Sequence, residues 1–144
     1  MRRRLAECGN LTQIAQVPAQ EFGRVLVVDD DLLIRDTLAT ALADEGYSVR
    51  VAADGKAALE TLDEWLPDLI VLDLMMPVMD GHAFRAEQQS RGVAAHIPVI
   101  VLSAAHNVQA RASSLGAAAV FPKPFDLGTL LDAVERTVRQ PPAA

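Results

Sequence analysis

The feature that most constrains the fold is an alternation of short apolar runs with stretches of helical spacing. The third run, Leu69–Leu72, is apolar at every position, which is typical of a strand that helices cover on both faces. The last helical stretch, from Leu127 to Val138, places apolar residues at the i, i+3, i+4 and i+7 positions of an amphipathic helix. The predicted strands are, in chain order, Val25–Val28, Ser48–Ala52, Leu69–Leu72, Pro98–Leu102 and Ala118–Phe121.

Strands that alternate with helices in this way predict βαβ units and therefore a parallel sheet. Because the crossovers are right-handed and helices must cover both faces, the expected fold is α/β and doubly wound, with five strands and five helices. The alternation does not determine the strand order, but the flavodoxin-like order 2-1-3-4-5 suits five strands. The predicted helices are, in chain order, Ile34–Leu42, a helix that opens at Asp54-Gly55 and ends before Pro67, the stretch after Gly81, Val108–Leu115 and Leu127–Val138.

The length of 144 residues fits one domain with a proper core. Residues 1–23 show no strong period, so we expect an extension that is flexible or partly helical. Residues 24–139 form the predicted globular domain, and residues 140–144 form a short tail.

Composition narrows the class of protein. A net charge of −6 argues against direct nucleic-acid binding, which usually needs a basic face. The single cysteine, Cys8, excludes an internal disulfide and fits a reducing compartment. No apolar stretch reaches the ~18 residues that cross a bilayer, and no secretory signal is recognisable. We therefore expect a cytosolic protein without a membrane anchor.

Polar side chains stand where the predicted strands end. Asp29 and Asp30 follow the first strand, Asp73 the third, Ser103 the fourth and Lys123 the fifth. The carboxyl ends of parallel strands lie along one edge of the sheet, and the crevice outside that edge is the usual ligand site. The sequence therefore predicts that three carboxylates, a hydroxyl and an ammonium group converge there.

Such a set of groups suits phosphoryl transfer to a carboxylate. Clustered carboxylates repel one another, and a hard cation such as Mg²⁺ (or Mn²⁺) relieves the repulsion. One carboxylate can then act as the nucleophile, while a lysine and a hydroxyl stabilise the charge of the transferred group. The chain has neither a GxxxxGK[ST] loop nor a GxGxxG loop for binding a nucleotide.

Four motifs in order resemble the receiver domain of response regulators, over roughly residues 24 to 139. They are Val27-Val28-Asp29-Asp30, the stretch from Val71 to Gly81 with Asp73 and Met75-Met76-Pro77, Val101-Leu102-Ser103-Ala104, and Lys123-Pro124-Phe125. The resemblance implies that Asp73 is the phosphoacceptor and Asp30 a direct metal ligand. It implies that Asp29 acts on the metal through water and that the backbone carbonyl of Met75 completes the ligands.

The resemblance also implies roles for Ser103, which would contact the phosphoryl group, and for Lys123, which would pair with it. The Lys123–Pro124 bond is typically cis in this family. Phosphate would come from a histidine kinase or a histidine phosphotransfer protein, so the chain would be a signalling domain and not an enzyme. We expect a monomer or weak dimer that signals to a separate protein through its fourth helix, its strand 118–121 and its last helix, because the chain stops soon after that helix.

One departure from the family pattern keeps a second function open. The family often has Tyr or Phe three residues before the lysine, and here that position is Val120, with Phe121 next to it. A pseudo-receiver, which binds partners without phosphorylation, is therefore the main alternative. A hydrolase with an aspartyl-phosphate intermediate would need a second acid two residues after the nucleophile, where this chain has Met75.

Overall fold

The structure, a computed structural model, describes residues 23–104 and 115–139. A five-stranded parallel sheet runs through it in the order β2-β1-β3-β4-β5, which confirms the expected fold class and strand order. The strands are β1 (Arg24–Val28), β2 (Ser48–Ala52), β3 (Leu69–Asp73), β4 (Val99–Ser103) and β5 (Ala119–Pro122). The helices are α2 (Leu32–Asp44), α3 (Gly55–Glu64), α4 (Gly81–Gln89), the 3-10 helix η2 (Gly92–His96) and α6 (Leu127–Arg139).

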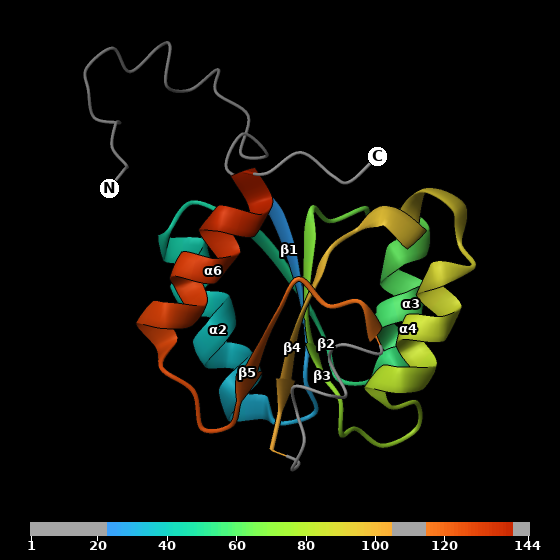
Figure 1. Ribbon diagram of the computed structural model, residues 1–144, viewed down its shortest axis with the longest axis horizontal. Helices are drawn as coiled ribbons and strands as arrows, with labels where there is room; N and C mark the ends of the chain where they lie inside the picture. Colours follow the sequence, from blue (N-terminus) through green and yellow to red (C-terminus); the bar gives the residue numbers. More distant parts are fainter. Residues whose placement is uncertain (1–22, 105–114, 140–144) are drawn as a thin grey trace, which may run out of the picture.

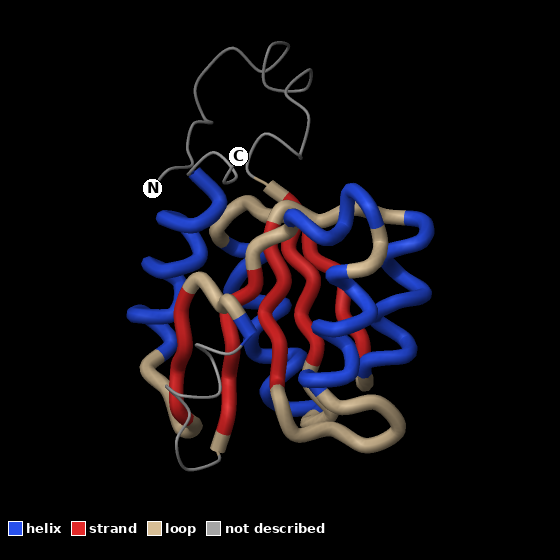
Figure 2. The backbone as a smooth tube through the Cα atoms, turned by 45° about the vertical axis from the view of Figure 1, so that its right-hand side comes forward, coloured by secondary structure: helices blue, strands red, loops and turns tan. Residues whose placement is uncertain are grey.

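Helices cover both faces of the sheet, as the apolar strands predicted. In Figure 1, α2 and α6 lie on one side of the strands, and α3 and α4 lie on the other. Figure 2 shows the strands side by side between these two layers. All five strands are parallel, so their carboxyl ends meet at one edge of the sheet, the lower edge in Figure 1.

The core follows the pleat of the strands. In β1, Leu26 and Val28 belong to the buried cluster under α3 and α4, whereas Val25 and Val27 belong to the cluster under α2 and α6. All four side chains are fully buried. Complete burial of a Val or Leu side chain contributes about 1.5–3 kcal/mol, so both faces of this strand stabilise the fold.

Aspartates begin three of the helices. Asp31, Asp54 and Asp80 are the N-cap residues of α2, α3 and α4, and each side chain accepts hydrogen bonds from backbone N–H groups of the first turn. An N-cap of this kind contributes about 1 kcal/mol. The third acid of the Asp29–Asp31 run is therefore a helix cap, in agreement with its position before a helix.

Gly81 allows α4 to begin against the loop that follows β3. A Cβ atom at this position would lie 2.7 Å from Leu74 Cα and 2.8 Å from the carbonyl oxygen of Asp73. The Gly81 N–H donates to the Leu74 carbonyl at 3.1 Å. Only a residue without a side chain fits there, and the start of α4 is thereby held next to Asp73.

Some predictions fall on residues that the structure does not describe. The fourth predicted helix lies mostly in residues 105–114, and the predicted extension and tail lie in residues 1–22 and 140–144, outside the described ranges.

The predicted strand at Pro98–Leu102 begins and ends one residue later than expected, at Val99–Ser103. Within the described residues, none of the helices is long and apolar enough to cross a bilayer.

Candidate functional site

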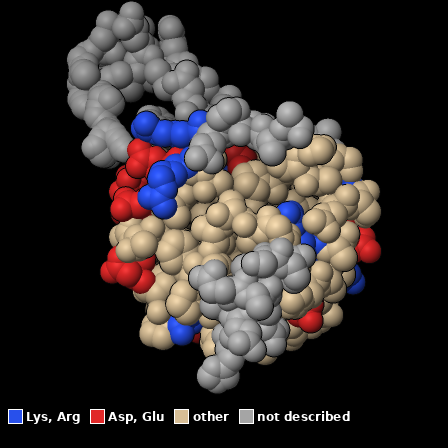
Figure 3. Space-filling model, viewed as in Figure 1, with Lys and Arg blue, Asp and Glu red and all other residues tan. Residues whose placement is uncertain are grey.

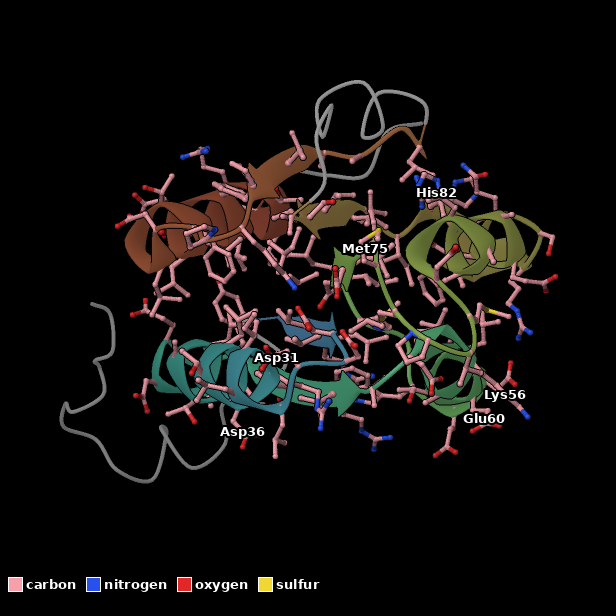
Figure 4. The ribbon with its side chains drawn as sticks, turned by 90° about the horizontal axis from the view of Figure 1, so that it is seen from below. Asp31, Asp36, Lys56, Glu60, Met75 and His82 are labelled. Carbon is pink, nitrogen blue, oxygen red and sulfur yellow. The ribbon has the colours of Figure 1, made fainter. Side chains whose placement is uncertain are left out.

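The residues predicted to converge do meet at the carboxyl edge of the sheet. Asp29 and Asp30 follow the central strand β1, Asp73 ends the neighbouring strand β3, and Lys123 follows β5. Figure 4 looks onto this edge. Asp31 and Met75, from the loops after β1 and β3, lie near the strand ends in that view, whereas Asp36, Lys56 and Glu60 lie at the periphery.

Asp29 is buried, and its polar groups are held from several sides. Its N–H donates to the Ala52 carbonyl at 3.1 Å, which extends the pairing of β1 with β2. Its Oδ1 accepts from the Asp31 N–H at 2.9 Å, and its Oδ2 accepts from Lys123 Nζ at 2.9 Å. The carboxylate is therefore oriented by one backbone donor and one cation.

Asp73 lies beside it and is only 2% exposed. Its Oδ1 accepts from the Met75 N–H at 3.1 Å, and its Oδ2 is 3.4 Å from Lys123 Nζ. One ammonium group thus serves two buried carboxylates, which leaves the pocket short of positive charge. Buried charges of this kind are costly unless each is paired.

The shortage of positive charge and the burial of the pocket shift the pKa values of Asp73 and Lys123. The pKa of Asp73 is raised from 3.8 to about 6: burial is the largest cause, the nearby Asp29 carboxylate also raises the pKa, and the Met75 hydrogen bond and Lys123 lower it. For Lys123, burial lowers the pKa, but the hydrogen bond to Asp29 and the field of Asp73 outweigh burial, so its pKa rises. The lysine therefore stays charged, and Asp73 is a stronger base than an exposed aspartate.

The pocket suits a hard divalent cation. Carboxylate oxygens of Asp29, Asp30 and Asp73 all lie within 4.8 Å of one another, and they offer only oxygen donors, which Mg²⁺ and Mn²⁺ prefer. Both oxygens of Asp29 already accept hydrogen bonds, whereas Asp30 is exposed to solvent. The donor set therefore fits a hard divalent cation, and Asp30 is the acid of the three that is open to solvent.

Ser103 and Met75 border the acids. Ser103 ends β4 and is fully buried, and its carbonyl accepts from the Lys123 N–H at 2.9 Å. Met75 is 58% exposed, so its side chain lies outside the core, while its N–H holds Asp73. The Lys123–Pro124 bond is cis, as the resemblance implied.

A shallow cleft opens beside Asp30, the exposed acid of the site. It is lined by Asp30, Leu74, Met75, Met76, Pro77, Asp80 and His82. Most of these residues belong to the loop between β3 and α4, directly after Asp73. The cleft therefore borders the site on the side of this loop.

Sequence reasoning missed one residue that contacts the site. Arg35, in the first turns of α2, donates from Nη1 to the carbonyl of Asp29 at 2.9 Å. It is the only basic residue of α2, and this isolation is the one sequence signal that could have drawn attention to it.

Sequence reasoning also missed a buried polar pair in α4. Arg85 donates to Gln88 Oε1 at 2.7 Å and to the Leu115 carbonyl at 2.9 Å. Gln88 donates to the carbonyls of Ala94 and Ile97 at 2.8 and 3.1 Å. The pair joins α4 to η2 and to Leu115, which precedes the turn into β5. This polar pair lies away from the acids.

Charges of both signs lie close together on the face that carries α6. Figure 3 shows basic and acidic side chains near one end of this helix, and much of the remaining visible described surface is uncharged. Arg139 and Glu135 pair there at 3.0 Å. The described part of this face therefore presents mixed charge.

Comparisons with known proteins agree with the geometry. Residues 25–135 match the family model described as the response regulator receiver domain. The chain is 41% identical over 119 residues to the response regulator MprA of Mycobacterium tuberculosis, a match that covers 81% of this chain and 51% of MprA. The chain thus spans about half the length of the curated relatives it matches.

Solved structures are similar in fold and in size. The receiver domain of the Francisella response regulator 1452 superimposes with a TM-score of 0.75 at 31% identity, covering 81% of this chain and 97% of that one. The chemotaxis response regulator CheY4 of Vibrio cholerae gives a TM-score of 0.74 at 32% identity, covering 81% and 98%.

Proposed function

Because this chain belongs to the receiver domain family of response regulators, we propose that Asp73 accepts a phosphoryl group from a phosphohistidine donor. The observation that carries the proposal is the pairing of one ammonium group, Lys123, with two buried carboxylates that a third carboxylate approaches within 4.8 Å. A pocket of this charge favours a divalent cation and the phosphoryl group that it would bind.

The proposed reaction forms a bond between a carboxylate oxygen of Asp73 and phosphorus, and it breaks the phosphorus–nitrogen bond of the donor. The electron pair of that bond leaves with the imidazole of the donor. Because the pKa of Asp73 is about 6, the carboxylate is mostly ionised at neutral pH and is a better nucleophile than an ordinary aspartate. The buried position excludes bulk water from the attacking oxygen.

The neighbouring residues hold the groups around this step. Asp30, Asp73 and the carbonyl of Met75 would hold Mg²⁺ or Mn²⁺, with Asp29 acting through water, and the ion would neutralise charge on the phosphoryl oxygens. Lys123 stays charged and can turn from the carboxylates toward the oxygens of the phosphoryl group, because the new bond to phosphorus removes the negative charge of the Asp73 carboxylate. Ser103, at the end of β4, would donate its hydroxyl proton to a phosphoryl oxygen.

The partners follow from the same proposal. The donor is a histidine kinase or a histidine phosphotransfer protein, and the phosphorylated domain signals to a separate protein through the face that includes β5 and α6. Lys123 follows β5 directly, so a movement of this lysine toward a phosphoryl group reaches that face through adjacent backbone. The only chemistry proposed for the domain is its own phosphorylation and dephosphorylation at Asp73, so it acts as a phosphoacceptor signalling domain and not as an enzyme that turns over a separate substrate.

A pseudo-receiver is the second candidate, and Val120 favours it. This residue occupies the position where the family often has an aromatic side chain, and it packs against the core cluster under α3 and α4. A domain that lacks this aromatic residue could bind its partner without phosphorylation. The intact acids and Lys123 favour the phosphoacceptor.

The test is labelling by acetyl phosphate in Mg²⁺, followed by intact-mass measurement. We expect a mass increase of one phosphoryl group that is lost in alkali and that is absent in Asp73→Asn. The exposed Asp36→Asn is the matched control, because it makes the same chemical change on the surface of α2 and should label like the wild type. An unlabelled wild type, with both acetyl phosphate and a phosphohistidine protein as donors, would refute the proposal and favour the pseudo-receiver.

A further inference from the structure

The contact between Arg35 and the carbonyl of Asp29 connects α2 to the site. Nη1 of this half-buried side chain lies 2.9 Å from the Asp29 oxygen, and the residue itself is held in the helix because its N–H donates to the Asp31 carbonyl at 2.9 Å. Asp31 is also the N-cap of α2. Arg35 therefore folds back from the first turns of the helix onto the strand end that carries the acids.

This contact completes the set of interactions that fix Asp29. The N–H of Asp29 donates to Ala52, its Oδ1 accepts from Asp31 and its Oδ2 accepts from Lys123. The carbonyl is the remaining polar group of the residue, and Arg35 is its donor. With all of these groups held, neither the main chain nor the side chain of Asp29 can turn without breaking a hydrogen bond.

The Asp29 carbonyl is bonded to the backbone nitrogen of Asp30, so its position affects where the Asp30 side chain begins. The Asp29 carbonyl and the Asp30 N–H share one planar peptide group, so a donor that holds the carbonyl also sets the plane from which Asp30 begins. The Asp30 side chain is exposed, and its direction depends on the backbone that carries it. Fixing this plane keeps the exposed carboxylate within 4.8 Å of the two buried ones.

We propose that Arg35 is a positioning residue for the cation site: it holds the Asp29–Asp30 peptide so that Asp30 and Asp73 can share one divalent ion. This inference rests on the metal site of the proposed function and adds a residue that does not touch the ion. The planar guanidinium group presents its donors in a fixed geometry, which suits the orientation of a single carbonyl.

The positive charge of Arg35 acts in the opposite direction, because it repels a cation. The two effects give opposite signs on removal of the side chain: loss of positioning weakens binding of the ion, and loss of repulsion strengthens it. Salt screens this repulsion little, because the half-buried guanidinium group lies beside the acids, well inside the Debye length of about 10 Å; Arg35→Lys, which keeps the charge, separates the two effects. Partners that orient the ligands of a metal typically change its affinity by roughly 10–100-fold, so positioning should dominate.

The test is the Mg²⁺ affinity of the whole chain, measured by isothermal titration calorimetry on the wild type, Arg35→Gln and Arg35→Lys. We expect Arg35→Gln to weaken Mg²⁺ binding roughly tenfold. Arg35→Lys keeps the charge and one donor on a different stem, so it should restore part of the affinity. If Arg35→Lys binds Mg²⁺ as weakly as Arg35→Gln, a donor to the carbonyl is not what positions the site, and the inference fails. If Arg35→Gln binds Mg²⁺ as tightly as the wild type, or more tightly, the inference is likewise overturned.

Two control variants separate positioning from charge and from stability. Arg139→Gln removes one positive charge at the end of α6, and Val134→Ala weakens the core under α6. Both should bind Mg²⁺ like the wild type. If the wild type binds no Mg²⁺, the proposed function fails; if the wild type binds and Arg35→Gln matches it, only this inference fails. If Arg35→Gln does not fold, Arg35→Lys is compared with the wild type instead: weaker Mg²⁺ binding supports the inference, and equal or tighter binding overturns it.

Discussion

Replacing Asp73 by asparagine should stabilise the protein when no divalent cation is present. The side chain is 2% exposed, and burial raises its pKa from 3.8 to about 6. One pKa unit corresponds to ~1.4 kcal/mol, so the ionised carboxylate costs about 3 kcal/mol of folding free energy at neutral pH. This figure is already net of the attraction to Lys123 at 3.4 Å, and asparagine keeps an acceptor for the Met75 N–H, although its own N–H groups need partners in the buried pocket. We therefore expect a net gain of about 1–3 kcal/mol.

The pH dependence has a definite sign. Because the pKa of Asp73 is higher in the folded state, protonation favours folding, and the contribution of this group is fully present below about 4 and lost as the pH rises through about 6. The advantage of Asp73→Asn over the wild type is therefore largest above pH 7. It should be smaller by about 1.3 kcal/mol at pH 5, where about half of the ionisation cost is gone.

The assay is urea unfolding at pH 7.5 and pH 5, in a chelator and in Mg²⁺, followed by circular dichroism. Mg²⁺ should stabilise the wild type, whose carboxylate can hold the ion, more than Asp73→Asn. Asp36→Asn, an exposed change of the same kind, should stay within about 0.5 kcal/mol of the wild type. If Asp73→Asn were no more stable than the wild type at pH 7.5 without metal, or if its gain did not shrink at pH 5, the reasoning about the buried carboxylate would be refuted.

Two further substitutions test how α4 is held, with urea unfolding as the measurement for both. Gly81→Ala places a Cβ 2.7 Å from Leu74 Cα, so we expect a loss of about 1–3 kcal/mol, and wild-type stability would contradict the close approach. Gln88→Leu leaves Arg85 and two backbone carbonyls without their partner, so it should cost about 2–4 kcal/mol, whereas Gln89→Leu on the exposed side of the helix should cost little. Equal losses at positions 88 and 89 would show that the buried pair contributes nothing.

The fold and the meeting of the acids could be predicted from sequence because two simple rules determine them. A strand that is apolar throughout, such as Leu69–Leu72, must have both faces covered, and this requirement leads to a doubly wound sheet. In a parallel sheet the residues after each strand share one edge, so Asp29, Asp73 and Lys123 were expected along that edge, whereas their close contact also depends on the strand order, which the alternation did not determine. The chemical roles of these residues remain proposals that the experiments above test.

The buried arginines could not be predicted in this way. The acceptor of Arg35 is a backbone carbonyl, and a carbonyl has no residue type that a sequence pattern could reveal. Arg85 and Gln88 are three residues apart on a helix, which in sequence looks like an ordinary solvent-exposed face. Their burial depends on how α4 packs against η2 and on the position of Leu115, and these are tertiary features.

The most direct test of the account is an experimental structure of the protein with Mg²⁺ and beryllofluoride, which mimics a phosphoryl group. The account predicts beryllium bonded to a carboxylate oxygen of Asp73, the ion in contact with Asp30 and Asp73, and Lys123 turned from Asp29 toward a fluorine. An ion bound elsewhere, or a Lys123 that still bridges Asp29 and Asp73 while the beryllium site stays empty, would contradict it.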